Sequence, residues 1–315
     1  MSKPLVSIIV CTYNRAGLLK EALPSMFAQS YEPAEIVVVD DGSTDNTREV
    51  IARYGDKIRY FRQGNKGLAA ARTVACRQLA RGEYIAFQDD DDVMPPDRII
   101  CLYEALRLHP RAVLAVGDWE TMDAEGNLTG QRITFGPGKN GEPHLIEDGY
   151  KAVMWPMLTP LPNATLFRRS DGERINWLDA RFSRSSDTDF FARLGRMGPI
   201  VYVPRVVSYY RTGHARMWSN SSRNNLLCEY NNFLLYEKHL SSVSGIRMEM
   251  LGRLRQRMLD TLKKLAFLSR FNEEIPEMAG SGYVKRGLSL LGPKERLSYA
   301  WYAGVRVPLR RAIKG

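Results

Sequence analysis

The first 117 residues alternate between two hydrophobic patterns, short runs rich in β-branched residues and longer stretches with helical spacing. The short runs predict strands at residues 5–10, 35–40, 57–61, 83–87 and 112–116. The longer stretches predict helices at residues 15–29, 45–54, 67–80 and 95–109. Because strands that are apolar on both faces need cover on both sides, this order predicts an α/β fold with a mostly parallel, Rossmann-like sheet flanked by helices.

The rest of the chain changes character twice. Residues 118–150 are rich in turn residues and predict a hairpin followed by a flexible segment. A helix is predicted at residues 187–197, with strands at 200–204 and 206–211. Beyond residue 219 the pattern is helical, and one apolar stripe is formed by Ile246, Met250, Leu254, Met258, Leu262 and Leu265.

The positive charge of the chain is concentrated at its end. The formal net charge is +10, and residues 246–315 hold 15 Lys and Arg against 6 Asp and Glu, a net of +9. This asymmetry predicts a partner of opposite charge, for which an anionic membrane surface is one candidate. A helical cap on the rest of the chain, or a dimer contact, is the alternative. No nucleic-acid-binding motif accompanies the basic residues, so nucleic acid is not an expected partner.

The cysteines and apolar runs bear on the location of the protein. The four cysteines are scattered without a CxxC pair, which favours neither a zinc site nor a disulfide framework and suits a reducing compartment. The apolar run at the N-terminus is too short for a signal peptide, and no stretch reaches the roughly 18 apolar residues of a membrane span. A cytoplasmic protein is expected, with peripheral contact at the inner face of the cell membrane as a further expectation.

Three polar stretches follow predicted strands of the sheet. They are "CTYNR" after the first strand, "DDGSTDNT" after the second and "QDDDD" after the fourth. Because ligands of parallel sheets bind at the carboxyl ends of the strands, these stretches are expected to meet on one rim. In the second stretch Gly42 suits a turn, and Ser43, Thr44 or Asp45 are available as helix caps.

The run Asp89–Asp92 places four carboxylates at the end of a buried strand. Like charges this close disfavour each other's ionised forms, so a positive group is expected among them, and a metal ion is the simplest candidate. The alternative is a solvated acidic turn ahead of the helix that follows Pro95.

Five blocks of the sequence together resemble the family 2 glycosyltransferases, the inverting enzymes of GT-A fold. The blocks are "VSIIVCTYNR", "EIVVVDDGSTDNT", "NKGLAAARTVA", "GEYIAFQDDDDVMPPDRI" and "SDTDFFARLGRMGPIVYVPRVVSYYR", and they span roughly residues 4–215. The resemblance implies a GT-A domain at residues 1–218, with a nucleotide-binding half (1–117) and an acceptor-binding half (118–218). Residues 219–315 would form a helical, basic C-terminal region.

The activity that the resemblance implies is transfer of a sugar from a nucleotide-diphosphate donor, with UDP expected, to a hydroxyl of a saccharide or lipid-linked acceptor. Such enzymes serve the synthesis of cell-surface polysaccharides or glycans. The implied nucleotide-binding residues are Thr12, Tyr13, Asn14, Arg15, Asp40, Asp41, Arg72, Asp89 and Asp90. The alternative role of Asp41 is to cap a helix, and the alternative for Arg72 is an ordinary charge on a helix surface. Next to Arg72, Thr73 stands where the family commonly has Asn.

The acidic run matches the Asp-any-Asp motif of the family. This implies that Asp89 and Asp91 handle the donor and a Mn²⁺ or Mg²⁺ ion, and hard oxygen ligands suit such ions. Asp90 with Asp92 is the alternative register. His214, in "YYRTGH", is implied to reach the metal or a phosphate, with assistance from Arg211.

An inverting transfer needs a base that takes the proton of the acceptor hydroxyl. Asp187 falls where the family has the Asp of a Glu-Asp pair, although Ser186 stands in place of Glu. Asp189 is the fallback, and a helix cap is the alternative role of Asp187. Trp155, Trp177 and Trp218 are either platforms for the acceptor sugar or core residues.

Two other functions compete with this interpretation. A nucleotidyltransferase would also pair a nucleotide with Mg²⁺, but "CTYNRAG" is a poor phosphate loop. The second competing function is a non-catalytic scaffold that binds nucleotide-sugars or glycans at the membrane. It is considered because Ser186, in place of the family's Glu, is consistent with an active site that has lost its activity.

Overall fold

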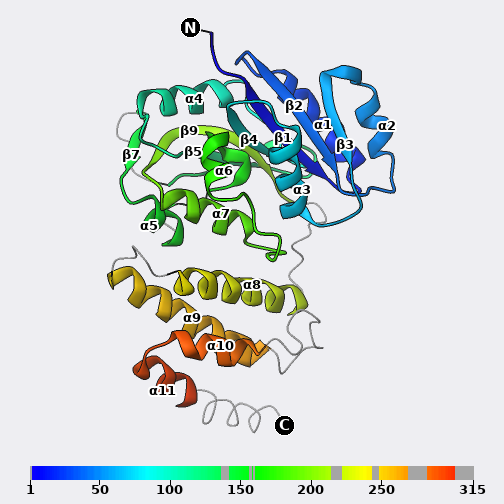
Figure 1. The fold of residues 1–315 in the computed structure, drawn as a ribbon. Helices are drawn as coiled ribbons and strands as arrows, with labels where there is room; N and C mark the ends of the chain where they lie inside the picture. The colour runs from blue at the N-terminus through cyan, green and yellow to red at the C-terminus, as the bar shows by residue number, and fades with distance from the viewer. Residues whose placement is uncertain are drawn as a thin grey trace. The chain divides into compact units, whose positions relative to one another are not determined.

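A nine-stranded sheet lies at the centre of the first of two units, residues 1–214 and 215–315, into which the chain divides (Figure 1). The computed structural model describes residues 2–135, 142–155, 158, 160–213, 222–242, 248–268 and 282–301. The strands are β1 (Val6–Thr12), β2 (Ala34–Asp40), β3 (Ile58–Arg62), β4 (Tyr84–Asp89), β5 (Leu114–Met122), β6 (Leu128–Ile133), β7 (His144–Ile146), β8 (Thr165–Arg168) and β9 (Ile200–Arg211).

The strand order is β3-β2-β1-β4-β8-β5-β9-β7, and β6 pairs with β5. Strands β1 to β4 pair in parallel, as do β5 and β9, whereas β8 runs antiparallel to β4 and β5. Strands β6 and β7 are also antiparallel to their partners. The predicted α/β fold with a mostly parallel sheet is confirmed.

Helices cover both faces of the sheet. They are α1 (Ala16–Phe27), α2 (Thr47–Ala52), α3 (Leu68–Val74), α4 (Arg98–Leu108), α5 (Gly149–Met154), α6 (Arg169–Arg174) and α7 (Ser186–Gly195). Helices α1, α2 and α4 share one core with Val6, Ile8 and Val10 of β1. On the other face Phe190 of α7 packs against Phe87 of β4 and Phe167 of β8, with ring centroids 6.0 and 5.1 Å away. Alternate residues of each strand thus fill two separate cores, which explains the continuous apolar runs.

The two strands predicted at residues 200–204 and 206–211 are one strand, β9, and that part of the prediction is wrong. Its register against β5 shifts at Asp118, next to Pro204, which has no N–H to give to the ladder. Asp118 is fully buried at this bulge, where it accepts hydrogen bonds from Tyr202 (2.5 Å) and Arg132 (2.5 Å). The bulge therefore anchors the predicted hairpin, whose second strand is β6.

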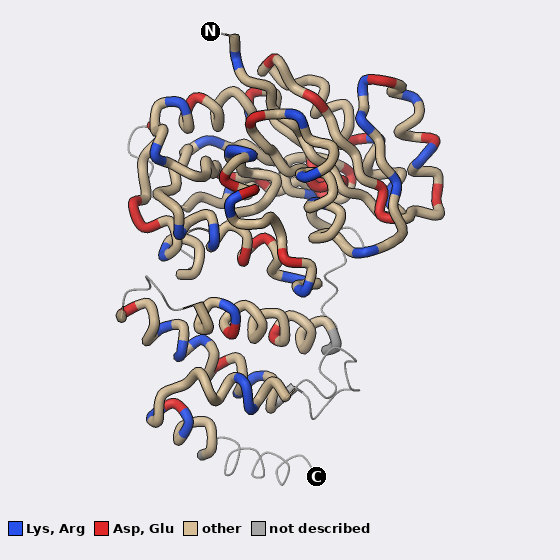
Figure 2. The backbone as a smooth tube through the Cα atoms, viewed as in Figure 1, with Lys and Arg blue, Asp and Glu red and all other residues tan. Residues whose placement is uncertain are grey.

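The second unit consists, within its described residues, of α8 (Ser222–Ser241), α9 (Met248–Leu268), α10 (Tyr283–Leu290) and α11 (Pro293–Trp301). The predicted stripe on α9 is buried from Met250 to Leu265, and α9 packs against α8, α10 and α11. Ile246 lies outside the described residues. The stripe is thus part of the core of this unit, and both Lys/Arg and Asp/Glu occur along its helices (Figure 2). Among the described helices, none has the length and apolar content to cross a bilayer.

Helices α5 and α7 are in close backbone contact at two glycines, Gly149 and Gly195. A Cβ on Gly195 would lie 2.5 Å from the Gly149 carbonyl carbon, and backbone atoms cannot retreat as a flexible side chain does. We expect Gly195→Ala to destabilise the protein by about 2 kcal/mol through overpacking. Gly17→Ala is the matched control in α1, because its Cβ meets nothing within 4 Å. It should be neutral or slightly stabilising in thermal unfolding, and equal melting points for both variants would contradict the contact.

Candidate active site

The three polar stretches that follow β1, β2 and β4 lie side by side on one rim. The parallel register pairs Thr12 with Asp40 and Cys11 with Asp89, so the ends of these strands are neighbours. Thr12 is buried in the same region as Asp90, whereas the Tyr13 side chain is 46% exposed. The rim therefore offers both buried carboxylates and an exposed aromatic ring.

The loops after β1 and β2 are tied to each other. Asn14, at φ 54°, accepts a hydrogen bond from the backbone N–H of Thr44 (2.7 Å) and donates its own N–H to Ser43 Oγ (2.9 Å). Asp45 accepts from the N–H groups of Ala16 (3.0 Å) and Thr47 (3.1 Å), at the starts of α1 and α2. Burial raises the pKa of Asp45, but the hydrogen bond from the Thr47 hydroxyl (2.6 Å) and those from the two N–H groups outweigh it and lower the pKa overall. Of the three predicted candidates, Asp45 is thus the one that accepts N–H groups at helix starts, although the N-cap position of α2 itself is Asn46.

Asp40 and Asp41 are engaged with the protein itself. Asp40 is 1% exposed and accepts from Ser43 N–H (2.7 Å) and the Tyr60 hydroxyl (2.9 Å). Asp41 is 5% exposed and accepts from the N–H groups of Lys66 (2.9 Å) and Gly67 (2.8 Å), directly before α3. In this structure these carboxylates shape the loops around the rim, and their predicted contact with the nucleoside stays a prediction.

Asp89 and Arg72 form an ion pair at the tip of β4. Arg72 Nη2 lies 2.5 Å from Asp89 Oδ1, and its guanidinium lies 5.0 Å from the centre of the Phe87 ring. The Arg72 side chain is 4% exposed and the Asp89 side chain 29%. Burial raises the pKa of Asp89, Arg72 opposes this, and the charges of Asp91 and Asp187 raise it further. Arg72 is therefore buried in the rim, which rules out the alternative of a surface charge.

Asp90 and Asp91 share Arg15 as their cation. Arg15 Nη1 lies 3.0 Å from Asp90 Oδ1 and 2.6 Å from Asp91 Oδ2. Burial raises the pKa of Asp90 to about 7, although Arg15 opposes the shift. Burial by itself lowers the pKa of Arg15, but Asp90 and Asp91 outweigh it and raise the pKa. A positive group does sit among the acids, as charge repulsion predicts, and here it is an arginine.

Asp92 is buried within the protein and has partners other than Arg15 and Arg72. It is 1% exposed and accepts from the Arg211 backbone N–H (2.8 Å) and from the Asn163 side-chain amide. Burial, followed by the charges of Asp89 and Asp91, raises its pKa well above the ordinary value. Asp92 is thus a structural residue of the loop, which favours the pair Asp89 and Asp91 over the register Asp90 and Asp92.

The loop is supported by buried polar side chains, of which Gln88 and Arg98 were not singled out by the sequence pattern. Gln88 Nε2 donates to the carbonyls of Asp89 (3.1 Å) and Asp92 (3.0 Å), and fully buried Arg98 donates to Gln88 Oε1 (2.6 Å). Arg211 Nε donates to the Asp91 carbonyl (2.8 Å) and Nη2 to Glu21 Oε2 (2.6 Å). In this structure Arg211 therefore holds the acidic loop in place. Its predicted role, assisting His214 toward the metal or a phosphate, stays a prediction.

Asp187 lies in the first turn of α7 and close enough to Asp89 for their charges to interact. Its Oδ1 accepts the Thr188 N–H (2.8 Å), and within the described ranges Oδ2 has no hydrogen-bond partner. Asp189, the fallback, is fully buried and paired with Arg193 at 2.7 Å. Of the two carboxylates, only Asp187 is accessible to a substrate.

The donor set of the acidic loop fits Mg²⁺ or Mn²⁺ held partly by the substrate. Carboxylate oxygens suit these ions, and Asp89 and Asp91 keep 29% and 16% of their side-chain surface exposed. In the part of the chain that the structure describes, no group of three or more His, Cys, Asp or Glu is arranged to hold a metal ion. His214 and Trp218 lie outside the described residues. Asp89 and Asp91 would therefore supply a few ligands, with phosphate and water as the others.

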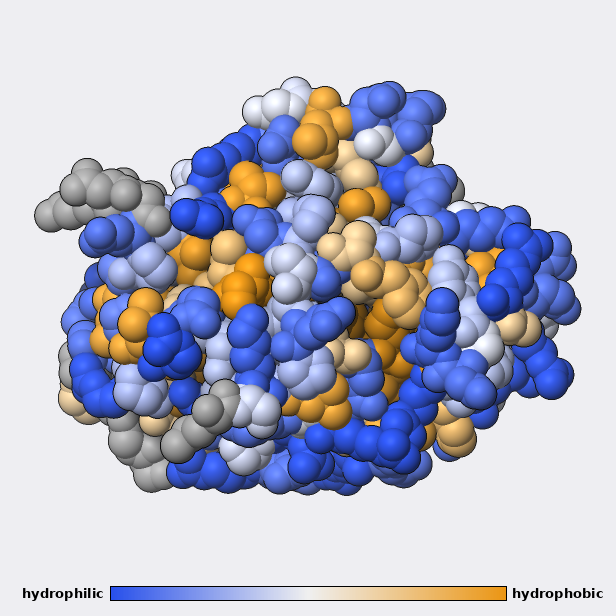
Figure 3. Space-filling view, turned by 90° about the horizontal axis from the view of Figure 1, so that it is seen from above, coloured by the Kyte–Doolittle hydropathy of each residue, from blue (hydrophilic) through white to orange (hydrophobic). Residues whose placement is uncertain are grey.

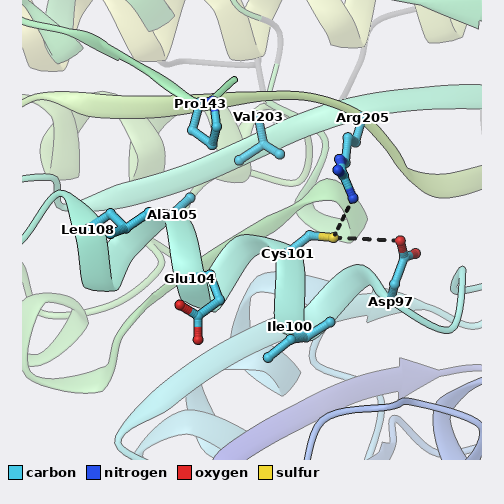
Figure 4. A pocket seen from close by; sticks show the side chains of 9 residues that line it. All are labelled: Asp97, Ile100, Cys101, Glu104, Ala105, Leu108, Pro143, Val203 and Arg205. Carbon is cyan, nitrogen blue, oxygen red and sulfur yellow. Dashed lines mark hydrogen bonds between the residues drawn. The ribbon is translucent and has the colours of Figure 1, made fainter. Parts of the chain in front are cut away.

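A separate pocket of about 380 Å³ lies along α4 and β9 (Figure 4). Its lining is mainly apolar, with Arg205 donating to Cys101 Sγ (3.8 Å) and Cys101 to Asp97 (3.6 Å). None of the single residues predicted to bind the donor or the metal, and neither Trp155 nor Trp177, lines it. Seen from above, apolar residues form separate groups among hydrophilic ones (Figure 3). The predicted site is therefore the rim at the strand ends.

The chain belongs to the glycosyl transferase family 2, whose model matches residues 7–175, more than half of its length. The matched segment includes Arg15, Arg72 and the acidic loop, and it ends before Asp187. An uncharacterized glycosyltransferase of Rickettsia felis is 41% identical over 127 residues, which are 39% of this chain and 21% of that relative. The match thus spans about a fifth of the relative's length.

Two solved structures have the same fold at low sequence identity. Residues 1–349 of S. aureus TarS, in complex with UDP, have 18% identity and a TM-score of 0.62, over 95% of this chain and 87% of that one. The mannosyltransferase PcManGT from Pyrobaculum calidifontis, in complex with GDP-Man and Mn²⁺, has 18% identity and a TM-score of 0.54, over 98% and 88%. At this identity the likeness establishes the fold.

Proposed function

We propose that the protein is an inverting glycosyltransferase that moves a sugar from a UDP-sugar to a hydroxyl of a saccharide or lipid-linked acceptor, in the synthesis of a cell-surface polysaccharide or glycan. The observation that carries this is the cluster of Asp89, Asp90 and Asp91 with Arg72 and Arg15 at the carboxyl ends of the parallel strands, where such sheets bind their ligands. The charge of Asp187, an accessible carboxylate on α7, also acts on Asp89. The UDP complex of TarS supports the choice of donor.

In the proposed reaction Asp187 Oδ2 takes the proton of the acceptor hydroxyl. The acceptor oxygen forms a bond to the anomeric carbon as the bond from that carbon to the diphosphate oxygen breaks. The electron pair of the broken bond leaves with the nucleoside diphosphate, and the configuration at the anomeric carbon inverts. The Thr188 N–H fixes the carboxylate through Oδ1, which leaves Oδ2 toward the substrate.

The leaving diphosphate carries charge that the rim must balance. Asp89 and Asp91 would hold a Mn²⁺ or Mg²⁺ ion, whose contribution when bound is to neutralise the developing negative charge. The Mn²⁺ in the PcManGT complex supports this choice of ion. Arg72 keeps Asp89 oriented through the 2.5 Å ion pair. Thr12, Tyr13 and Asn14 follow β1 on the same rim and would bind the nucleoside.

We also propose a division of labour along the chain. Residues 1–117 would bind the nucleotide, residues 118–218 the acceptor, and residues 219–315 would form the basic helical region. Peripheral contact with an anionic membrane would then be electrostatic, because the apolar stripe of α9 is already buried. Such contact would bring the enzyme to a lipid-linked acceptor at the inner face of the membrane.

The test is a donor panel. The protein is incubated with UDP-, GDP- and dTDP-sugars and Mn²⁺, and released nucleotide is measured by mass spectrometry. We expect release from a UDP-sugar, and loss of that release when EDTA removes the metal. Binding of donors without turnover across the panel would support the scaffold instead, and turnover that persists in EDTA would remove the metal from the proposal.

A further inference from the structure

The acids of the loop have two kinds of hydrogen-bond and ion-pair partners: groups that are buried in the fold, and the more exposed Arg15. Asp92 accepts from the Arg211 backbone and Asn163, and Asp89 is held by Arg72, whose side chain is only 4% exposed. Arg72 also packs against the Phe87 ring, so its guanidinium is confined inside the protein. These partners are permanent parts of the fold.

Arg15 differs from the other partners in its freedom. It follows the β1 loop, and its side chain is 25% exposed. In the described part of the chain, its side chain donates hydrogen bonds through one nitrogen, Nη1. This nitrogen lies 3.0 Å from Asp90 Oδ1 and 2.6 Å from Asp91 Oδ2. The backbone beside it is fixed separately, because Asp45 accepts the Ala16 N–H (3.0 Å). The guanidinium can therefore withdraw into solvent without disturbing α1.

We propose that Arg15 is the resident counter-ion of the acidic loop, and that its guanidinium and a divalent cation compete for Asp91. The inference rests on the proposed function, since it concerns the site assigned there to the metal. The physical reason is repulsion between a singly and a doubly charged cation that would share one carboxylate within a few Å. Binding of the ion thus requires Arg15 to leave Asp91 Oδ2, and in the ion's absence Arg15 offsets part of the negative charge of Asp90 and Asp91.

The test measures Mn²⁺ alone, without nucleotide or sugar, by isothermal titration calorimetry of the full chain. Arg15→Gln removes the competing charge but keeps a polar side chain of similar length. We expect it to bind Mn²⁺ about tenfold more tightly than wild type, within the usual range of coupling between two ligands of one site. Arg15→Lys keeps the charge and should bind with an affinity close to that of wild type.

The matched control is Arg59→Gln. Arg59 is similarly exposed, at 30%, and pairs with Glu35 at 3.3 Å. Glu35 lies at the opposite end of β2 from the rim, so this variant makes the same charge change away from the acidic loop. Its Mn²⁺ affinity should equal that of wild type, and an equal gain in both Gln variants would trace the effect to net charge and overturn the inference.

Other outcomes are decisive as well. Unchanged or weaker Mn²⁺ binding by Arg15→Gln overturns the inference, as does the absence of Mn²⁺ binding in both wild type and variant. Failure of the proposed function is separate, because it appears as a donor panel without turnover and leaves the Mn²⁺ titration untouched. Tighter binding in Arg15→Gln with no turnover would therefore support Arg15 as the competitor and reject the transferase.

Discussion

Asp187→Asn is expected to lower the rate of sugar transfer by about 10³-fold while leaving donor affinity nearly unchanged. An amide cannot accept the acceptor's proton, and general-base catalysis of this kind contributes about 10² to 10⁴ in rate. The variant keeps the shape of the side chain and an oxygen for the Thr188 N–H, so α7 should start as before. The measurement is transfer kinetics at saturating donor, together with calorimetric titration of UDP.

Asp189→Asn supplies the control two residues away. Asp189 is fully buried and its pair, Arg193, also donates to the Trp177 carbonyl (2.6 Å). Loss of this charge should destabilise the protein by about 2 kcal/mol, since a buried cation loses its counter-charge. Transfer by the folded fraction should persist. If Asp189→Asn stopped transfer at unchanged stability while Asp187→Asn remained active, the base would have been assigned to the wrong carboxylate.

Much of the fold follows from local pattern. The strands around "VSIIV" and "EIVVVD" lie within two residues of their predicted bounds, because strands buried on both faces leave an unbroken apolar run. The prediction failed at Pro204, where a proline that breaks the ladder resembles a strand end. Tertiary pairing with β5 continues β9 past it, from Val206 to Arg211.

The rim could be predicted, but the partners of its acids could not. A run of aspartates predicts a positive neighbour, yet nothing local distinguishes a metal from Arg15, which is 75 residues away from Asp90 along the chain. Arg98 is the clearest omission. It lies on a helix predicted from its period, where arginine ordinarily faces solvent, and it is fully buried under the loop. The only local signal is its position near the start of the helix after "QDDDD".

Residue type alone also does not show whether a tryptophan belongs to the core or binds the acceptor sugar. Trp177 is 2% exposed, and a Cβ on Gly172 would lie 2.3 Å from its ring, so its role is in the core. Trp155 is partly exposed at the end of α5 and remains a candidate platform. Because an indole suits both a core and a sugar-binding face, burial decides between them.

Arg211→Ala should be among the most destabilising single substitutions on the rim. The Arg211 side chain is 1% exposed and donates to the carbonyls of Asp91 (2.8 Å) and Ala124 (2.8 Å), and to Glu21. Its removal leaves two carbonyls without this donor and a void where a large side chain was, which together cost about 3 kcal/mol. For a unit the size of residues 1–214 the melting point should fall by about 6 to 12 °C.

Arg205→Ala is the matched control on the same strand. Arg205 is exposed, and its described hydrogen bond goes to Cys101 Sγ at 3.8 Å, so truncation should change stability by no more than about 0.5 kcal/mol. Since Arg211 joins the acidic loop to the β5–β6 turn, Arg211→Ala should also weaken Mn²⁺ binding, measured below its melting point. Equal melting points for the two variants would show that the loop is held without Arg211, and would leave the Asn163 and Gln88 contacts as its supports.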